Sequence, residues 1–266
     1  MRIFHKTDDP ETLRFEAAGL RWLAEATDEG GAPVVEILGE GEGWLDLVHL
    51  PTASPTPAAA AAFGRGLART HAAGAPSFGC APPGWQGPVP RSSGPMPLHP
   101  YDAPPTYPGW AQFYAEDQIR PYVRRALARG AIDDDGARVL ERVADRLESG
   151  DLDHDQPALV GTGAARLHGD LWGGNVVWTQ GEEGLRGVLI DPAAHGGHAE
   201  TDLAALDLFG VDRLPDILAG YQEVSPLAEG WRERVGLHQL TMLVMHAVIF
   251  GGSYGPQTVR VARRYV

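Results

Sequence analysis

The 266-residue sequence has little cysteine and few basic side chains relative to acidic ones. Cys80 is the one cysteine, so no disulfide can form within the chain, and a reducing compartment is expected. Lysine and arginine together number 22, against 35 aspartates and glutamates, which gives a net charge of −13. A protein that binds nucleic acid needs a basic face to meet the phosphates, so this balance argues against that class.

Long apolar runs are also missing. The longest apolar stretch, residues 237–250, is interrupted by four polar side chains, His238, Gln239, Thr241 and His246. Because a membrane-spanning helix needs about 20 predominantly apolar residues, we expect no membrane contact. The first six residues are not followed by the apolar segment of a signal peptide, so we expect a cytoplasmic protein. The composition, 43% hydrophobic and 21% charged, is typical of a globular chain with one large core or two unequal lobes.

The segment from His168 to Asn175 carries the strongest functional signal. Its sequence, H-G-D-L-W-G-G-N, has the H-x-D-L-x-x-x-N spacing of the kinase catalytic loop, with Gly169 where protein kinases carry arginine. Asp191 follows at the end of the apolar run 188–190. In phosphoryl transfer one Asp accepts the proton of the attacking hydroxyl, while an Asn and a second Asp hold magnesium on the phosphates. Asp170, Asn175 and Asp191 fit these three roles; the alternative is a turn and a strand end without function.

The first fifty residues predict a small sheet with one helix. Residues 2–7 form the first expected strand, and the Asp-Pro pair at 9–10 begins a helix that extends to about residue 27. Glu16 lies on the apolar face of this helix, where an ionised carboxylate is costly unless it is paired. Lys6 on the preceding strand is the nearest candidate, and a strand Lys paired with a helix Glu holds the ATP phosphates in kinases. A solvated glutamate at the edge of the face is the alternative.

Two more strands, residues 34–39 and 43–50, are expected around a turn at 40–42. The end of the second strand, Val48, His49 and Leu50, would form a hinge whose backbone groups contact adenine. The Pro-rich segment 51–57 has the composition of a linker. We therefore expect residues 1–50 to form a nucleotide-binding lobe, and residues 51–266 to form a helical lobe with the catalytic loop and the substrate site.

The remaining chain is predicted to be mainly helical. An alanine-rich helix follows the linker, with His71 as a packed core residue. Residues 76–108 contain 11 of the 22 prolines, which excludes a helix or an inner strand and leaves a loop at the substrate mouth or a solvent-facing insertion. A hairpin is expected between 176–178 and 188–190, and a helix beginning at Thr201 or Asp202. Further helices are expected at 110–129 with a kink at Pro121, at 132–147, at 212–223 and at 231–249.

Several segments together resemble the fructosamine kinase, or ketosamine-3-kinase, family. They are residues 15–20, 110–121, 168–175, 191–193, 197–198, 202–204 and the tail 250–254. H-G-D alone is shared across the aminoglycoside phosphotransferase and choline kinase branch, whereas H-G-D-L-W-G-G-N with D-P-A and G-H is more specific. The resemblance implies an α+β, bilobal protein-kinase-like fold, with a small antiparallel sheet of about three strands and a mainly helical C-terminal lobe.

The resemblance also implies a reaction: ATP-dependent phosphorylation of the sugar 3-hydroxyl of a ketosamine, carried by a free amine or a glycated protein lysine. The phosphorylated adduct then falls apart, which removes the glycation. Asp170 matches the catalytic base, and Asn175 and Asp191 match the Mg²⁺ ligands. Lys6 with Glu16 matches the phosphate-binding pair, and His168 and Asp202 match residues that brace the catalytic loop. Trp172, beside the base, would stack on the sugar ring or serve simple packing.

One departure from the family concerns the N-terminus. Family members carry about two strands and a glycine-rich loop before the ATP lysine, whereas Lys6 is five residues from Met1. Either the true start lies upstream or the chain binds ATP weakly, so a catalytically impaired nucleotide-binding protein is one alternative. Others are a phosphotransferase of the aminoglycoside or choline kinase type, and a metallohydrolase with His168, Asp170, His195 and His198 as ligands.

Overall fold

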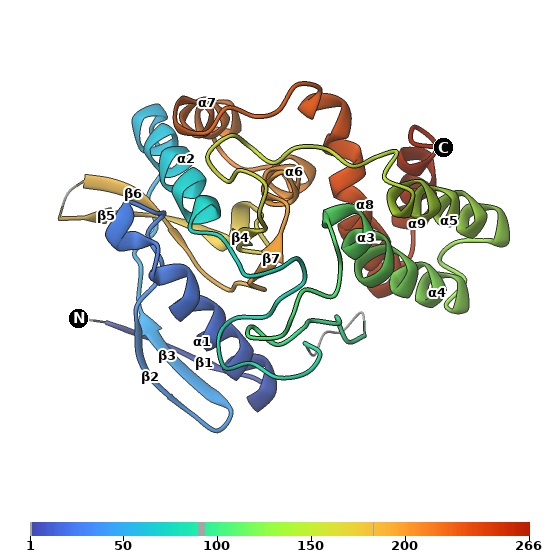
Figure 1. Ribbon diagram of the computed structural model, residues 1–266. Coiled ribbons are helices and arrows are strands. Elements are labelled where there is room, and N and C mark those ends of the chain that lie inside the picture. The colour runs from blue at the N-terminus through green and yellow to red at the C-terminus, as the bar shows by residue number, and fades with distance from the viewer. Residues whose placement is uncertain (1, 90–93, 183) are drawn as a thin grey trace.

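The structure is a computed structural model that describes residues 2–89, 94–182 and 184–266. A three-stranded sheet and one helix occupy one end of the molecule, and helices α3, α4, α5, α8 and α9 gather at the other end (Figure 1). In the same view, helices α2 and α7 and a β-hairpin lie above the sheet, and helix α6 lies at the centre, between the two ends. This arrangement places the segment 168–175 between the two ends.

The N-terminal sheet is antiparallel, in the order β1-β3-β2. Its strands are β1 (Ile3–Thr7), β2 (Ile37–Gly41) and β3 (Trp44–Val48). Helix α1 (Pro10–Ala24) begins where predicted, because the Asp9 side chain accepts hydrogen bonds from the amides of Glu11 and Thr12. It ends at Ala24, earlier than expected, and a short 3₁₀ turn follows. Its buried face packs against β3 through Leu13, Ala17 and Leu20.

The predicted bounds of the second and third strands were wrong. The second strand begins at Ile37, not at residue 34, because the chain before it pairs with another strand. The Val35 amide donates to Leu189 O at 3.0 Å, and the Leu189 amide donates to Pro33 O at 2.8 Å. The turn consequently shifts to residues 42–43. This pairing joins the N-terminal sheet region to the strand that leads into Asp191.

The middle of the molecule is built on the predicted hairpin of β5 (Val176–Gly181) and β6 (Gly184–Leu189). Helices α2 (Pro57–Ala72), α6 (Ala199–Phe209) and α7 (Leu214–Val224) share one apolar cluster with it. Helix α6 begins two to three residues earlier than expected, with His198 as its N-cap. Two short strands that were not predicted, β4 (Ala165–Leu167) and β7 (His195–Gly197), pair antiparallel and bring the segments before 168 and after 191 together.

The helical end has its own core. Helix α3 (Trp110–Phe113) continues through a π-helical turn (Tyr114–Ile119) into α4 (Arg120–Ala128). The irregular turn directly precedes Pro121, the site of the predicted kink, since proline supplies no amide to an α-helical ladder. Helices α5 (Asp134–Glu148), α8 (Trp231–Phe250) and α9 (Tyr254–Ala262) complete this core, and α9 was not predicted. Among the described residues, none of the helices combines the length and the apolarity that a bilayer crossing demands.

The described part of the Pro-rich segment forms no helix, as expected. It packs on α1, because Trp85, Val89 and Met96 share a buried cluster with Phe15 and Ala193. The rings of Phe15 and Trp85 meet edge-on, with centroids 5.0 Å apart. Phe15 immediately precedes Glu16, and Ala193 follows Asp191-Pro192. The segment therefore packs against α1 next to Glu16 and Asp191, two residues of the predicted site.

Two glycines determine how closely α2 and α7 approach. A Cβ at Gly64 would lie 2.0 Å from Ile217 O, and a Cβ at Gly220 would lie 2.0 Å from Ala61 O. We expect Gly64→Ala to lower the free energy of unfolding by about 1–3 kcal/mol, because overpacking forces the two helices apart. Urea unfolding measures the effect. Gly163→Ala is the matched control, since nothing lies within 4 Å of a Cβ there; equal stability of the two variants would contradict the close packing.

Candidate active site

The loop that follows β4 requires glycine at position 169. Gly169 has a φ of +78°, and a Cβ there would lie 2.1 Å from Ala193 O and 2.7 Å from His195 Nδ1. Neither the backbone conformation nor the space admits a larger side chain. This explains why glycine occupies the position at which protein kinases carry arginine.

A buried carboxylate holds this loop in place. Asp202 accepts hydrogen bonds from the amides of His168 at 2.7 Å and Gly169 at 3.0 Å. His71 Nε2 lies 3.2 Å from the same carboxylate, and His71 Nδ1 lies 2.9 Å from the Tyr221 hydroxyl. Burial raises the pKa of Asp202, but the hydrogen bond and charge of His71, with smaller contributions from His168 and the Gly169 amide, outweigh it, so the pKa is lowered. Asp202 is therefore held ionised.

The His168 amide contacts Asp202, and the family resemblance matched both residues to positions that brace the catalytic loop; two further members of this hydrogen-bond network were missed. His71 was expected only as a packed core residue; it is fully buried and bonded to Asp202. Tyr221 lies on the distant helix α7, and no motif marked it. His168 Nε2 lies 2.8 Å from Ile190 O, so the same network also contacts the residue before Asp191.

Lys6 joins the sheet, helix α1 and the segment after β6. Its ammonium donates to Glu16 Oε2 at 2.7 Å and to Asp191 Oδ1 at 2.9 Å. Lys6 is also the single lysine of the 266 residues. Asp191 has a φ of +51°, one of two non-glycine residues with positive φ among those described. Such backbone strain is typical of functional sites, where the surroundings hold the residue in place.

The environment of this trio shifts two pKa values. Burial raises the pKa of Glu16 to about 7, although the hydrogen bond and the charge of Lys6 act in the opposite direction. Burial lowers the pKa of Lys6, but the hydrogen bonds from its ammonium to Glu16 and Asp191 and their negative charges raise it by more. Lys6 therefore carries its charge at neutral pH, while Glu16 is close to its point of half-protonation.

Asn175 links the loop to Asp191. Its Nδ2 donates to Asp170 O at 2.8 Å and more weakly to Asp191 O at 3.4 Å. The hydrogen-bond donors of the amide are thereby used, which leaves Oδ1 as the atom available for a cation. Carboxylate and amide oxygens are the protein ligands that Mg²⁺ prefers. The chemistry of Asn175 and Asp191 therefore fits that ion.

A cavity of about 700 Å³ is lined by four residues of the predicted site. Glu16, Asp170, Asp191 and Trp172 line it, and Trp172 is 43% exposed. Much of the remaining lining is apolar or aromatic and was not predicted as part of the site; its residues include Phe209, Met245, His246, Ile249, Phe250 and Tyr254. The family-like tail 250–254 was the one signal in the sequence that could have found it. The cavity lining thus combines carboxylates with apolar and aromatic side chains.

The predicted hinge residues lie apart from this cavity, because none of Val48, His49 and Leu50 lines it. The Val48 amide donates to Glu36 O, and the His49 amide donates to Arg2 O, both at 3.0 Å. These two amides are committed to the sheet region. His49 Nδ1 is buried without a hydrogen-bond partner among the described residues.

A sequence model of the fructosamine kinase family matches residues 1–266. The chain belongs to the fructosamine kinase family. A crystal structure of a putative fructosamine-3-kinase from Thermobifida fusca is 41% identical, with a TM-score of 0.82, over 99% of this chain and 85% of that one. A probable ketoamine kinase from Synechocystis is 32% identical over 257 residues, which cover 96% of this chain and 78% of the relative.

The similarity to some other curated family members is more local. A probable ketoamine kinase from Enterococcus faecium is 42% identical over 99 residues, so the chain spans about a third of its length. More distant is an ADP-bound aminoglycoside phosphotransferase, 12% identical with a TM-score of 0.60 over 99% of this chain and 88% of that one. This last likeness shows the fold alone. Together the neighbours confirm the predicted α+β, bilobal kinase-like fold.

The alternative metallohydrolase site does not form among the described residues. His168, Asp170 and His195 belong to no group of potential metal ligands among the described residues. His168 and His195 each have a ring nitrogen 2.8 Å from a backbone carbonyl, of Ile190 and Ala193 respectively. His198 does lie in such a group, but with His154, Glu200 and His238.

The raised pKa of Glu16 predicts a pH effect on nucleotide binding. Above pH 7 the carboxylate is ionised and pairs with Lys6; below it, protonation removes one charge partner of the ammonium. We expect the KM for ATP to rise as the pH falls through about 7. Steady-state kinetics across this range in wild type and in Glu16→Gln measure the effect. Glu16→Gln should show a raised KM for ATP at every pH in this range and should lack the pH dependence that comes from residue 16. Titration of ATP itself affects both proteins equally. Superimposable pH profiles would contradict the assignment.

Proposed function

We propose that the protein is an ATP-dependent kinase that phosphorylates the sugar 3-hydroxyl of ketosamines, which leads to deglycation. One observation carries this proposal. Two distant parts of the sequence, the N-terminal region with Lys6 and Glu16 and the later region with Asp170, Asn175 and Asp191, meet at one site, in contact with each other or with one cavity. These are the residue types that position ATP, its cation and an attacking hydroxyl in phosphoryl transfer.

The proposed roles follow from the contacts. Asp170 lies at the cavity wall and accepts the proton of the sugar hydroxyl. The hydroxyl oxygen then forms a bond to the γ-phosphorus of ATP, and the bond from that phosphorus to ADP breaks. Lys6, fixed by Glu16, binds the ATP phosphates. Asn175 and Asp191 would hold Mg²⁺, which when bound offsets the charge of the phosphates. His168 and Asp202 keep the loop in position, since the two loop amides donate to Asp202.

The proposed nucleotide-binding and substrate-binding residues fall in two lobes of the chain. Residues 1–50 would form the nucleotide-binding lobe and residues 51–266 the lobe with the substrate site. At the hinge, adenine would contact the backbone at Leu50 and the carbonyl groups of Val48 and His49, since the amides of these two residues are already bonded. The proposed setting is the cytoplasm.

The exposed ring of Trp172 supports a sugar as acceptor. Trp172 lies beside Asp170 and keeps 43% of its surface exposed, so its face is available to the C–H side of a sugar ring. The amine of the ketosamine would be a free metabolite or a protein lysine. An aminoglycoside or a choline-like alcohol is the competing acceptor class within this fold.

The proposal is tested by magnesium-dependent release of ADP with a fructosamine or ribulosamine as acceptor. We expect Asp170→Asn to lower kcat by about 10²- to 10⁴-fold, the usual effect of removing a general base. Asp135→Asn is the matched control, because this carboxylate is exposed on α5 and far from the loop in sequence. Full activity in Asp170→Asn would exclude the assigned base. Turnover with aminoglycosides or choline, but not with ketosamines, would exclude the assigned acceptor.

Binding can be separated from catalysis through Lys6, because the sequence contains no other ε-amine. At alkaline pH, where part of the Lys6 amine is uncharged and is acetylated in the free protein, ATP with magnesium should protect it from acetylation, detected by peptide mass spectrometry, in both wild type and Asp170→Asn. Protection without turnover of any acceptor would identify an impaired nucleotide-binding protein. Absence of protection would remove Lys6 from the ATP site.

A further inference from the structure

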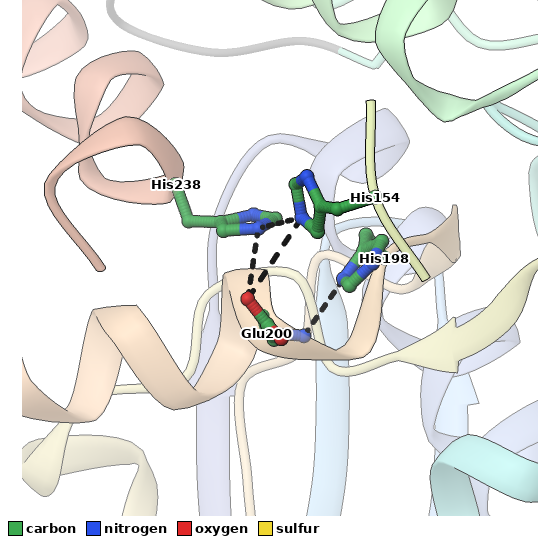
Figure 2. Close-up of side chains that lie close together, drawn as sticks. All are labelled: His154, His198, Glu200 and His238. Atoms are coloured by element: carbon green, nitrogen blue, oxygen red, sulfur yellow. Dashed lines mark hydrogen bonds and ion pairs between the residues drawn. The ribbon is translucent and has the colours of Figure 1, made fainter. Parts of the chain in front are cut away.

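A second cluster of ionisable groups lies outside the ATP cavity. His154 comes from the connection between α5 and β4, His198 and Glu200 from the start of α6, and His238 from α8 (Figure 2). One potential ligand atom of each lies within 4.8 Å of the others. None of the four lines the 700 Å³ cavity.

The Nδ1 atoms of His154 and His238, which point away from the cluster, already have hydrogen-bond partners that orient the two rings. His154 Nδ1 lies 2.9 Å from Leu152 O, and because a carbonyl only accepts, Nδ1 carries the hydrogen and Nε2 presents a lone pair. His238 Nδ1 lies 2.9 Å from the Thr201 hydroxyl, which can donate or accept. This pattern, an outer ring nitrogen bonded to a carbonyl or hydroxyl, is how proteins orient metal-binding histidines.

The inner atoms converge on one point. His154 Nε2 and His238 Nε2 are 2.9 Å apart, and Glu200 Oε2 lies 3.5 Å from His238 Nε2 and 3.8 Å from His154 Nε2. In a tetrahedral zinc site with metal–nitrogen bonds of about 2.0–2.1 Å, neighbouring ligand atoms are roughly 3.3 Å apart. The three spacings bracket this value, so adjustments of a few tenths of an ångström suffice.

The surroundings keep the imidazoles neutral, as metal ligands must be. Burial, reinforced by the neighbouring histidines, holds the pKa of His238 and of His198 well below the usual value; burial also lowers that of His154. The Trp110 ring covers all three, with centroid distances of 4.6–5.2 Å. The cluster is thus a desolvated set of lone pairs around one carboxylate.

Glu200 and His198 have further partners. Arg234 donates to Glu200 Oε1 at 2.7 Å and to Oε2 at 3.1 Å, so the oxygen nearer the histidines is the less tightly held. His198 Nδ1 accepts from the Glu200 amide, and His198 Nε2 faces Asp155 O, each at 3.2 Å. His198 therefore packs beside the site with both nitrogens committed to the backbone.

We propose that His154 Nε2, His238 Nε2 and Glu200 Oε2 bind one divalent transition-metal ion of the zinc class, at a site separate from that of ATP. Without the ion, His238 Nε2 carries the hydrogen that lies between the two imidazoles. When the ion binds, His238 carries its hydrogen on Nδ1 instead and donates it to the Thr201 hydroxyl, so both rings stay neutral. The ion joins the α5–β4 connection, α6 and α8. Imidazole and carboxylate ligands in this number suit zinc rather than magnesium.

The test uses the purified full chain after chelator treatment, titrated with ZnCl₂ by calorimetry and with Co²⁺ by visible absorption. We expect one ion per chain in wild type. His154→Gln and His238→Gln should abolish this binding, and Thr201→Val should weaken it by about 10- to 100-fold, the usual effect of losing an orienting partner. His5→Gln, which removes an exposed imidazole on β1, is the matched control and should bind as wild type does.

The proposal fails if wild type takes up no zinc, or if both histidine variants still bind one ion with unchanged affinity. His154 lies in a loop and is less buried than His238, so its variant remains informative if His238→Gln does not fold. Zinc that persists in His154→Gln but is lost in Asp191→Asn would lie at the ATP site, which also overturns the proposal. Because these measurements involve neither ATP nor an acceptor, their failure leaves the kinase assignment untouched.

Discussion

The buried carboxylate of Asp202 is the constraint on which the site depends. It is 1% exposed, and an ionised group at that depth persists only when several donors surround it. Two of those donors are the loop amides of His168 and Gly169. The same hydrogen bonds therefore stabilise the charge of Asp202 and fix the conformation of the loop. The effect extends further, since the same loop presents Asp170, and the Asp170 carbonyl fixes the amide of Asn175.

The N-terminal sheet and helix α1 are joined to the segment around Asp191 by contacts of three different kinds. Lys6 crosses from the sheet to Asp191 by an ion pair. The backbone of residues 33–35 pairs with β6 just before Asp191. The Pro-rich segment packs between Phe15 and Ala193 through apolar contacts. Each contact ends within two residues of Glu16 or Asp191, so the geometry of that pair is determined from several directions.

The parts of the structure that the sequence predicted are those with a local signal. Residue spacing sufficed to predict that Asp170, Asn175 and Asp191 lie close together. Helical periodicity placed Glu16 on the inner face of α1, near Lys6. The bounds of β2 were wrong because residues 33–35 pair with Leu189, about 150 positions away, and no local pattern records that. Strands β4 and β7 are three residues long, too short for any periodicity. His71 and Tyr221 support Asp202 from distant helices, so only the folded chain reveals them.

Lys6 has one more chemical consequence. Amines add to the carbonyl group of reducing sugars only in their uncharged, nucleophilic form, and in this chain the one lysine amine is held charged between two carboxylates with its pKa raised. Every other basic side chain apart from histidine is an arginine. The protein therefore offers almost no lysine for spontaneous glycation, and its own surface stays largely free of the kind of adduct that its family is named for.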